Sequence, residues 1–295
     1  MSLIGIDLGG TAIKAGCFDE HGNRTATLSV PTPRPATPEA VLAALAKIVT
    51  CLDPDAEAHA IGVGVPGLVD AGGKVVLTTI NLDGHWQDVP LAEWLSKQTG
   101  RLVVLGNDAN LAGLGEVWLG VASRYTDVVF LTLGTGVGGA LILGGKVFTG
   151  THGLAGELGH MLLDPDGPSC PCGSNGCLEQ FVSAPAIRRR FGLEAVELGQ
   201  RADQGDVLAL HCWQQVGRDL GYALAGLVNL LNPEVIVVGG GVSPSSRHFF
   251  PATLEQIRKR AIVYSPDLQL LEATLGNEAG SIGAARLALM NSGRE

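Results

Sequence analysis

One histidine and three cysteines within residues 156–179 (GELGHMLLDPDGPSCPCGSNGCLE) constrain this chain more than any other feature. The three cysteines fall within eight consecutive residues, and the histidine lies ten residues before the first of them. Zinc binds four nitrogen and sulfur ligands tetrahedrally, and a Cys3His set that fills all four positions is typical of a structural site. We therefore expect structural Zn²⁺ to be bound by His160, Cys170, Cys172 and Cys177. The alternative is a glycine-rich loop that holds ordinary reduced cysteines.

Two acidic residues bracket this cysteine loop, a name used below for residues 156–179. Gly173 and Gly176 let the chain turn tightly between the cysteines, because glycine adopts backbone angles that other residues avoid. A loop tied by a metal would hold the carboxylates of Glu157 and Glu179 in fixed positions. The loop therefore predicts a binding site that uses these two acids.

The N-terminal segment has the pattern of a strand, a glycine turn and a returning hairpin. Residues 3–8 (LIGIDL) are typical of a buried strand, and a hairpin pattern follows over residues 15–30. Backbone N–H groups can approach a phosphate where no Cβ intervenes, and an acid beside them could hold Mg²⁺ through water. The alternative is a hairpin with no ligand. The expected phosphate and Mg²⁺ residues are Asp7, Gly9, Gly10, Thr11 and Lys14.

The same theme returns in residues 127–148, where a buried strand, a glycine turn and a second strand follow one another. The pieces LGGT (8–11) and LGTG (133–136) lie 125 residues apart, and such an echo suggests two similar halves that face one another. Two such turns could grip a polyphosphate, so we add Gly134, Thr135 and Gly136 to the expected phosphate contacts. Neither turn has the pattern of a P-loop or of a dinucleotide-binding loop.

A polar cluster, Asn107-Asp108-Ala109-Asn110, ends the predicted strand at residues 101–110. Open α/β sheets bind their ligands at the carboxyl ends of strands. Asp108 is therefore a candidate general base, and the alternative is that an Asp or Asn here caps the next helix.

Other segments follow ordinary helix and strand patterns. Thr37 is a predicted N-cap for a helix that runs to about Leu52, and residues 233–243 predict a parallel strand. Residues 74–89 are polar and predict no regular element. Further strands are expected at 60–67 and 267–275, and further helices at 90–99, 206–232, 247–260 and from 277 or 278 onward.

Composition excludes several classes of protein. A net charge of −9 argues against nucleic-acid binding, which usually needs a basic face. No apolar run reaches the roughly 18 residues of a membrane span, and the N-terminal residues do not resemble a signal peptide. Cys17, Cys51 and Cys212 are scattered in apolar contexts, so the cysteines do not form a disulfide framework. We expect a cytoplasmic enzyme.

Several motifs together resemble the ROK family of sugar kinases, which includes bacterial ATP-dependent glucokinases. The string C-x-C-G-x-x-G-C-x-E is the most specific of them, and the others are shared more broadly with the actin–hexokinase superfold. The motifs are IGIDLGGT (4–11), GNDAN (106–110), LGTGVGG (133–139), GLAGELGH (153–160), CPCGSNGCLE (170–179) and VIVVGGG (235–241).

The resemblance implies an α/β fold of two actin/hexokinase-like (ribonuclease H-like) domains around a central cleft, with a zinc knot. The implied N-terminal domain covers residues 1–109 plus 279–295, and the C-terminal domain covers residues 110–278. Asp108 matches the family's catalytic base, and His160 would bind zinc through one nitrogen and the sugar through the other. The implied sugar ligands are Gly67, Asn81, Asn107, Asp108, Glu157, His160 and Glu179, and Gly239 and Gly240 match the adenosine side of the ATP site.

The resemblance thus implies phosphorylation of glucose to glucose 6-phosphate with ATP and Mg²⁺, by a homodimer or homotetramer. One alternative is a kinase for another hexose, such as N-acetylmannosamine, N-acetylglucosamine, mannose or fructose. Some N-acetylmannosamine kinases have His where this chain has Glu157, which favours glucose. Another alternative is a sugar sensor without activity. Some family members are repressors with an N-terminal helix-turn-helix, for which we expect no room here because the phosphate strand begins at residue 3.

Overall fold

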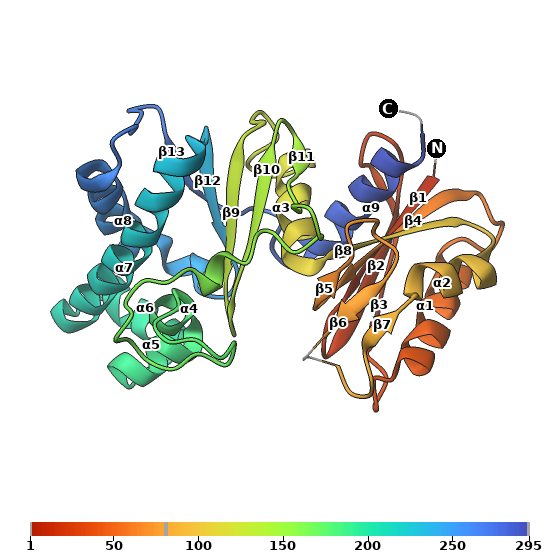
Figure 1. Cartoon of the computed structure of the whole chain (residues 1–295), viewed down its shortest axis with the longest axis horizontal. Coiled ribbons are helices and arrows are strands. Elements are labelled where there is room, and N and C mark those ends of the chain that lie inside the picture. The colour runs from red at the N-terminus through yellow and green to blue at the C-terminus, as the bar shows by residue number, and fades with distance from the viewer. Residues whose placement is uncertain (1, 80–81, 294–295) are drawn as a thin grey trace. The chain divides into compact units, whose positions relative to one another are not determined.

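The computed structural model describes residues 2–79 and 82–293, and the chain divides into two units (Figure 1). The first unit combines Met1–Ser123, Lys146–Gly156 and Leu275–Glu295, and the second combines Arg124–Gly145 and Glu157–Thr274. Two α/β units were expected, but the division differs from the predicted boundary after residue 109. The reason is that helix α3 (Asp108–Trp118) packs on helix α9 (Ala279–Asn291) of the same unit.

A mixed sheet in the order β3-β2-β1-β4-β8 forms the centre of the first unit. β2 lies antiparallel between β1 and β3, whereas β4 and β8 continue the sheet in parallel with β1. The predicted opening strand and hairpin are therefore confirmed. The strands are β1 (Ser2–Leu8), β2 (Ala12–Phe18), β3 (Arg24–Pro31), β4 (Ala58–Val65) and β8 (Leu102–Asn107).

The two faces of β1 meet different helices. Ile4 and Ile6 pack into a cluster with helix α1 (Pro38–Leu52) and helix α2 (Leu91–Thr99). On the opposite face, a Cβ at Gly5 would lie 1.9 Å from the Ser281 carbonyl oxygen, so glycine lets α9 approach the strand closely. Asp7 follows on this second face, and the α9 residue Gly280 has only 2.8 Å between its ideal Cβ position and Asp7 Cγ.

The segment predicted to be irregular, residues 74–89, contains part of a small antiparallel sheet, and that prediction was wrong. The sheet has the order β5-β6-β7. Its strands have two or three residues each, too few for an alternating pattern to be recognised. They are β5 (Leu68–Val69), β6 (Val76–Thr78) and β7 (Gln87–Val89), and a further short strand of the first unit is β11 (Lys146–Val147).

The second unit repeats the strand order of the first. β10 (Val137–Leu143) lies antiparallel to β9 (Val128–Leu133), and β12 (Val235–Gly239) and β13 (Gln269–Glu272) follow in parallel. The series β10-β9-β12-β13 thus corresponds to β2-β1-β4-β8. This confirms the internal repeat that the two glycine turns predicted.

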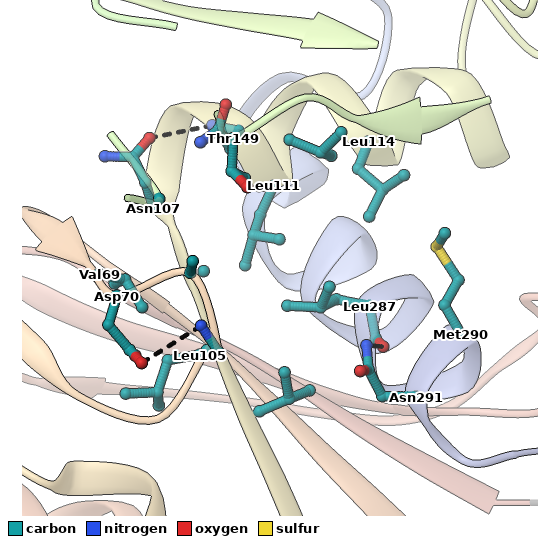
Figure 2. Close-up of a pocket in the computed structure, with 18 of the residues that line it drawn as sticks. Val69, Asp70, Leu105, Asn107, Leu111, Leu114, Thr149, Leu287, Met290 and Asn291 are labelled. Carbon is teal, nitrogen blue, oxygen red and sulfur yellow. Dashed lines mark hydrogen bonds between the residues drawn. The ribbon is translucent and has the colours of Figure 1, made fainter. Parts of the chain in front are cut away.

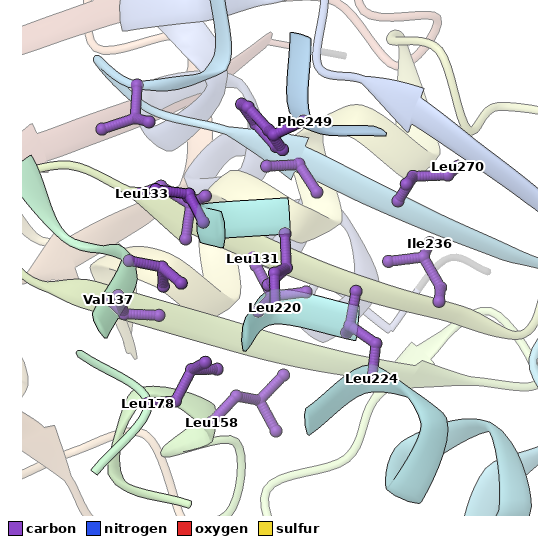
Figure 3. Close-up of a cluster of buried hydrophobic side chains, with 14 of the residues drawn as sticks. Leu131, Leu133, Val137, Leu158, Leu178, Leu220, Leu224, Ile236, Phe249 and Leu270 are labelled. Carbon is purple, nitrogen blue, oxygen red and sulfur yellow. The ribbon is translucent and has the colours of Figure 1, made fainter. Parts of the chain in front are cut away.

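One hydrophobic core holds the second unit together (Figure 3). Leu131 and Ile236 of the sheet, Leu220 and Leu224 of helix α7, and Leu178 of the cysteine loop share it. The loop is therefore anchored in the core at its C-terminal end. The helices of this unit are η1 (Leu158–His160), α4 (Glu179–Val182), α5 (Ala184–Phe191), α6 (Ala195–Asp203), α7 (Val207–Leu231), η2 (Ser243–Ser245) and α8 (Ser246–Arg260); η3 (Gly276–Glu278) lies in the first unit.

Helices α7 and α8 lie against one another because α7 has glycines at the contact. A Cβ at Gly217 would lie 2.3 Å from the Phe249 carbonyl oxygen, and one at Gly221 would lie 2.7 Å from the Thr253 carbonyl oxygen. Over the described ranges 2–79 and 82–293, none of the helices has the length and apolarity that a membrane span requires.

Candidate functional site

Asp7 lies near the carboxyl end of β1, opposite Lys14 of β2. The pKa of Asp7 is raised to about 6, chiefly by burial and also by the negative charge of Asp108, while Lys14 acts in the opposite direction. Asp7 and Asp108 are therefore close enough to repel one another, although 101 positions separate them in sequence. Two neighbouring carboxylates favour a bound cation, because a positive charge relieves both burial and repulsion.

The turn after β1 is closed by its own backbone and by two side chains from the segment after β3. Gly9 N–H donates to the Ala12 carbonyl oxygen at 3.0 Å, and a Cβ at Gly9 would lie 2.8 Å from that oxygen. Thr32 Oγ1 donates to the Gly9 carbonyl at 2.6 Å, and Arg34 Nη2 donates to the Gly10 carbonyl at 2.9 Å. These bonds hold the backbone of the turn in place. Thr11 is exposed, and the N–H groups of residues 10 and 11 take no part in the bonds just described.

Arg34 is a residue that the sequence did not single out. It also pairs with Asp83, at 3.2 Å between Nη1 and Oδ2. The only sequence signal is a basic side chain within the proline-rich segment 31–38. Its guanidinium places a positive charge at the turn expected to bind phosphate.

The polar cluster after β8 divides its tasks between two neighbouring residues. Asn107 caps α3, since its Oδ1 accepts from the Asn110 N–H at 3.1 Å, and its Nδ2 donates to the Gly67 carbonyl at 3.1 Å. Asp108 is the first residue of α3, and its Oδ1 accepts from the Ala109 N–H at 2.8 Å. The capping role that was an alternative for Asp108 therefore falls to Asn107. Of the two further expected sugar ligands, Gly67 is brought to Asn107, and Asn81 lies outside the described residues.

A cavity of about 280 Å³ in the first unit lies on another side of this cluster (Figure 2). Leu111 and Leu114 of α3 and Leu287 and Met290 of α9 line it, and Asn107 reaches its edge. Asp7 and Asp108 are not among its lining residues, so this cavity is separate from the pair of carboxylates.

In the second unit, the glycine turn between β9 and β10 is joined to the end of the cysteine loop. Gly134 N–H donates to the Gly136 carbonyl at 2.9 Å, and the Gly134 carbonyl accepts from the Ala184 N–H at 2.8 Å. Glu179 Oε2 accepts from the Val137 N–H at 3.0 Å. Thr135, at the tip of the turn, is exposed. This bond between a predicted sugar ligand and a predicted phosphate turn was not foreseen.

The histidine and three cysteines come together as the spacing predicted. The four ligand atoms lie within 4.8 Å of one another, with 3.7 Å between His160 Nδ1 and Cys170 Sγ and 3.6 Å between Cys172 Sγ and Cys177 Sγ. Tetrahedral bonds of about 2.3 Å to sulfur place sulfur atoms about 3.8 Å apart, so the donor set fits a zinc ion. The ring nitrogen of His160 that faces the cluster is Nδ1, which leaves Nε2 for another ligand.

Two glycines shape the cysteine loop as expected. Gly173 and Gly176 have φ angles of 92° and 64°, in the left-handed region that glycine adopts at no steric cost. A Cβ at Gly176 would also lie 1.5 Å from the Asp164 carbonyl oxygen. Glu157 is exposed just before η1, and its carbonyl oxygen accepts from the His160 N–H at 3.1 Å.

The predicted adenosine-side turn follows β12. Gly239 is buried at the end of the strand, and Gly240 has a φ angle of 87°. A Cβ at Gly240 would lie 2.4 Å from the carbonyl oxygen of Leu133, the last residue of β9. Gly240 therefore lies beside the start of the turn at residues 134–136.

The structure thus gathers the expected residues into two groups. The first unit holds Asp7, Gly9, Gly10, Thr11, Lys14, Gly67, Asn107 and Asp108, and the second holds Gly134, Thr135, Gly136, Glu157, His160, Glu179, Gly239, Gly240 and the three cysteines.

Known proteins share both the sequence and the fold. A glucokinase of Streptomyces coelicolor is 37% identical over 314 residues, covering 97% of this chain and 96% of its own. The crystal structure of a ROK hexokinase from Thermus thermophilus superposes with a TM-score of 0.88 at 38% identity, covering 98% of each chain. A ROK family glucokinase from Streptomyces griseus, solved in complex with glucose and AMPPNP, gives a TM-score of 0.81 at 35% identity, covering 99% of this chain and all of its own. The ROK family pattern itself matches residues 3–291, and the chain therefore belongs to the ROK family.

Proposed function

We propose that this protein is an ATP-dependent hexose kinase that converts glucose to glucose 6-phosphate. The observation that carries the proposal is the position of Asp108. It stands at the carboxyl end of a parallel strand, the cap of the following helix is supplied by its neighbour Asn107, and a second carboxylate lies close by. Glucokinases among the full-length relatives support glucose as the substrate.

Phosphoryl transfer requires positioning, neutralisation of the phosphate charge and an acceptor for the hydroxyl proton. Asp108 takes the proton from the 6-hydroxyl of the sugar while that oxygen attacks the γ-phosphorus of ATP, and ADP leaves as its bond to that phosphorus breaks. The N–H groups of the two glycine turns donate to phosphate oxygens, where negative charge develops. Asp7 would hold Mg²⁺ through water, and the cation would supply further neutralisation of the phosphates. Gly239 and Gly240, in the turn after β12, are the proposed contacts for the adenosine end of ATP.

Sugar recognition needs a polar partner for each hydroxyl, because a buried polar group left unpaired costs roughly 1–3 kcal/mol. Asn107 and Glu179 supply such partners from positions that hydrogen bonds already fix. Glu157 and His160, within the cysteine loop, add two more, and Gly67 and Asn81 complete the set. Zn²⁺ would be held by His160 and the three cysteines, and it would stabilise the loop that carries these ligands. A cytoplasmic location and a homodimer or homotetramer stay predictions.

A coupled ADP-release assay with Mg-ATP tests the proposal. The sugars are glucose, mannose, fructose, N-acetylglucosamine and N-acetylmannosamine, each over a range that defines kcat/KM. We expect glucose to give the highest value. A preference for an N-acetylated sugar would support the kinase activity but contradict glucose as its substrate. A folded, zinc-loaded protein that is silent on every sugar would contradict the kinase and favour a sugar sensor.

A further inference from the structure

The turn at residues 134–136 was expected to bind phosphate, yet its third residue faces a carboxylate of the chain itself. An ideal Cβ on Gly136 would lie 2.6 Å from Glu179 Oε2 and 3.6 Å from Glu179 Cδ. Real Cβ atoms essentially never approach another heavy atom to less than 3.0 Å. The absence of a side chain at residue 136 therefore leaves the space that the Glu179 carboxylate occupies.

Backbone geometry does not explain this glycine. Gly136 is not among the glycines with positive φ, so alanine can adopt its backbone conformation. Gly134, in the same turn, also has no positive φ, but a Cβ there would meet nothing within 4 Å. The two glycines are therefore sterically different, although both stand where a phosphate is expected to bind.

The next residue completes the contact. Val137 N–H donates to the same oxygen, Glu179 Oε2, at 3.0 Å. The carbonyl group of Val137, in the following peptide, packs on η1, because a Cβ at Gly159 would lie 2.0 Å from the Val137 carbonyl oxygen. Residues 136 and 137 thus touch Glu179 and also the segment that joins Glu157 to His160.

We propose that Gly136 and the Val137 N–H are positioning groups for the sugar: they set the location of the Glu179 carboxylate, and residue 136 thereby determines sugar affinity. This inference rests on the proposed function, in which Glu179 binds a sugar hydroxyl. It assigns to Gly136 a task different from the phosphate contact expected of the whole turn.

Titration calorimetry of glucose, without nucleotide, tests this with Gly136→Ala and the matched variant Gly134→Ala. The added methyl at residue 136 displaces a flexible side-chain end, so the variant should fold, and thermal unfolding verifies that. We expect Gly136→Ala to raise the Kd for glucose about tenfold, because a misplaced hydrogen-bond partner costs about 1.4 kcal/mol or more. Gly134→Ala should stay within about twofold of the wild-type Kd for glucose.

A double-mutant cycle with Glu179→Asp separates positioning from a general disturbance of the fold. The shorter Asp carboxylate lies further from the added methyl group. Gly136→Ala should therefore raise the Kd for glucose less than about threefold when it is compared with Glu179→Asp alone. The inference would be overturned if Gly134→Ala and Gly136→Ala raised the Kd for glucose equally. It would also be overturned if Gly136→Ala raised that Kd by the same factor with and without Glu179→Asp. A wild-type protein that neither binds nor phosphorylates any of the hexoses would instead overturn the proposed function, and this inference with it.

Discussion

The two glycine turns, residues 9–11 and 134–136, join strands of the same order in their sheets but obtain their charged groups differently. The first has an acid, Asp7, two positions before Gly9, and a lysine, Lys14, opposite that acid on β2. The second has no charged residue from Val128 to Leu143, and its carboxylate, Glu179, arrives from a segment 42 residues further along the chain. The carboxylate at the first turn therefore comes from the adjoining strand. The carboxylate at the second turn comes from the cysteine loop, which four potential metal ligands can fix in place.

This difference suggests a division of tasks. The charges of the first unit, Asp7 and Asp108, suit the handling of phosphate and a proton. The carboxylate at the second turn suits recognition of a neutral, hydroxyl-rich sugar. Variants that affect one unit and not the other test this division, and the largest effect is expected at Asp108 of the first unit.

Asp108→Asn should lower kcat about 10³-fold, roughly 4 kcal/mol of activation free energy, because the variant side chain cannot accept the hydroxyl proton. Steady-state ADP release with saturating glucose and Mg-ATP measures this. Asn107 keeps the cap of α3, so the variant should keep its fold and unfold at a temperature no lower than that of the wild type. Retention of more than about a tenth of the wild-type kcat would refute the role of Asp108 as base.

Asp7→Asn should stabilise the protein at pH 8 by up to about 3 kcal/mol, since it removes a buried charge. The pKa of Asp7 rises from 3.8 in the unfolded chain to about 6 in the fold, so the folded state holds more protons between these values. Stability attributable to this group therefore falls as pH rises from about 4 to about 6, and the cost is complete above that range.

Denaturant unfolding of the wild type and of Asp7→Asn at pH 8 and at pH 4 measures the difference. The stabilisation should be large at pH 8 and small at pH 4, while kcat at pH 8 falls because Mg²⁺ loses its carboxylate. An equal effect at both pH values would show that the charge of Asp7 is not the cause.

Cys172→Ala should remove one of four metal ligands and raise the Kd for glucose roughly 10–100-fold. Changes to residues that support a metal site typically lower metal affinity or activity by a factor of this size. The Kd for AMPPNP should change less than about threefold. Elemental analysis and calorimetry give the two readouts. Cys212→Ala, which removes a cysteine of α7 outside the cluster, is the control. A variant that keeps both zinc and glucose affinity would mean that the cysteine loop does not organise the sugar site.

The smallest effects are expected at two helix caps, one in each unit. Thr37 Oγ1 accepts from the Ala40 N–H at 3.3 Å, and Asp206 Oδ1 accepts from the Leu208 N–H at 2.9 Å. Replacing either residue with alanine should cost about 1 kcal/mol of unfolding free energy. Neither change should alter kcat or the Kd for glucose. A tenfold change in either quantity would show that these helix caps, and not only the turns and the cysteine loop, determine the positions of the binding groups.

Local patterns in the sequence predicted much of this fold. The cap at Thr37, the strands around both glycine turns and the metal-ligand cluster follow from residues that lie close in sequence. Their geometry depends on capping, periodicity and spacing, which short segments contain in full. The family itself was identified from such motifs and is confirmed.

Contacts between distant segments were not predicted. The bond from Val137 N–H to Glu179 and the bond from Arg34 to the Gly10 carbonyl depend on where the fold places separate segments. The packing of α3 on α9 moved the unit boundary for the same reason. A sequence pattern shows that a glycine is present, but only the folded chain shows which atom fills the space beside it.

Glucose titration of Asp108→Asn and Glu179→Gln, side by side with the wild type, tests the division of tasks between the two units most directly. The account predicts that Asp108→Asn binds glucose with a Kd within about threefold of the wild type, because it loses the proton acceptor and keeps a polar partner. Glu179→Gln should raise the Kd at least about tenfold, because the loss of an acceptor at a fixed position costs about 1.4 kcal/mol or more. An equal increase of the Kd for glucose in the two variants, or a larger increase in Asp108→Asn, would contradict this division of tasks.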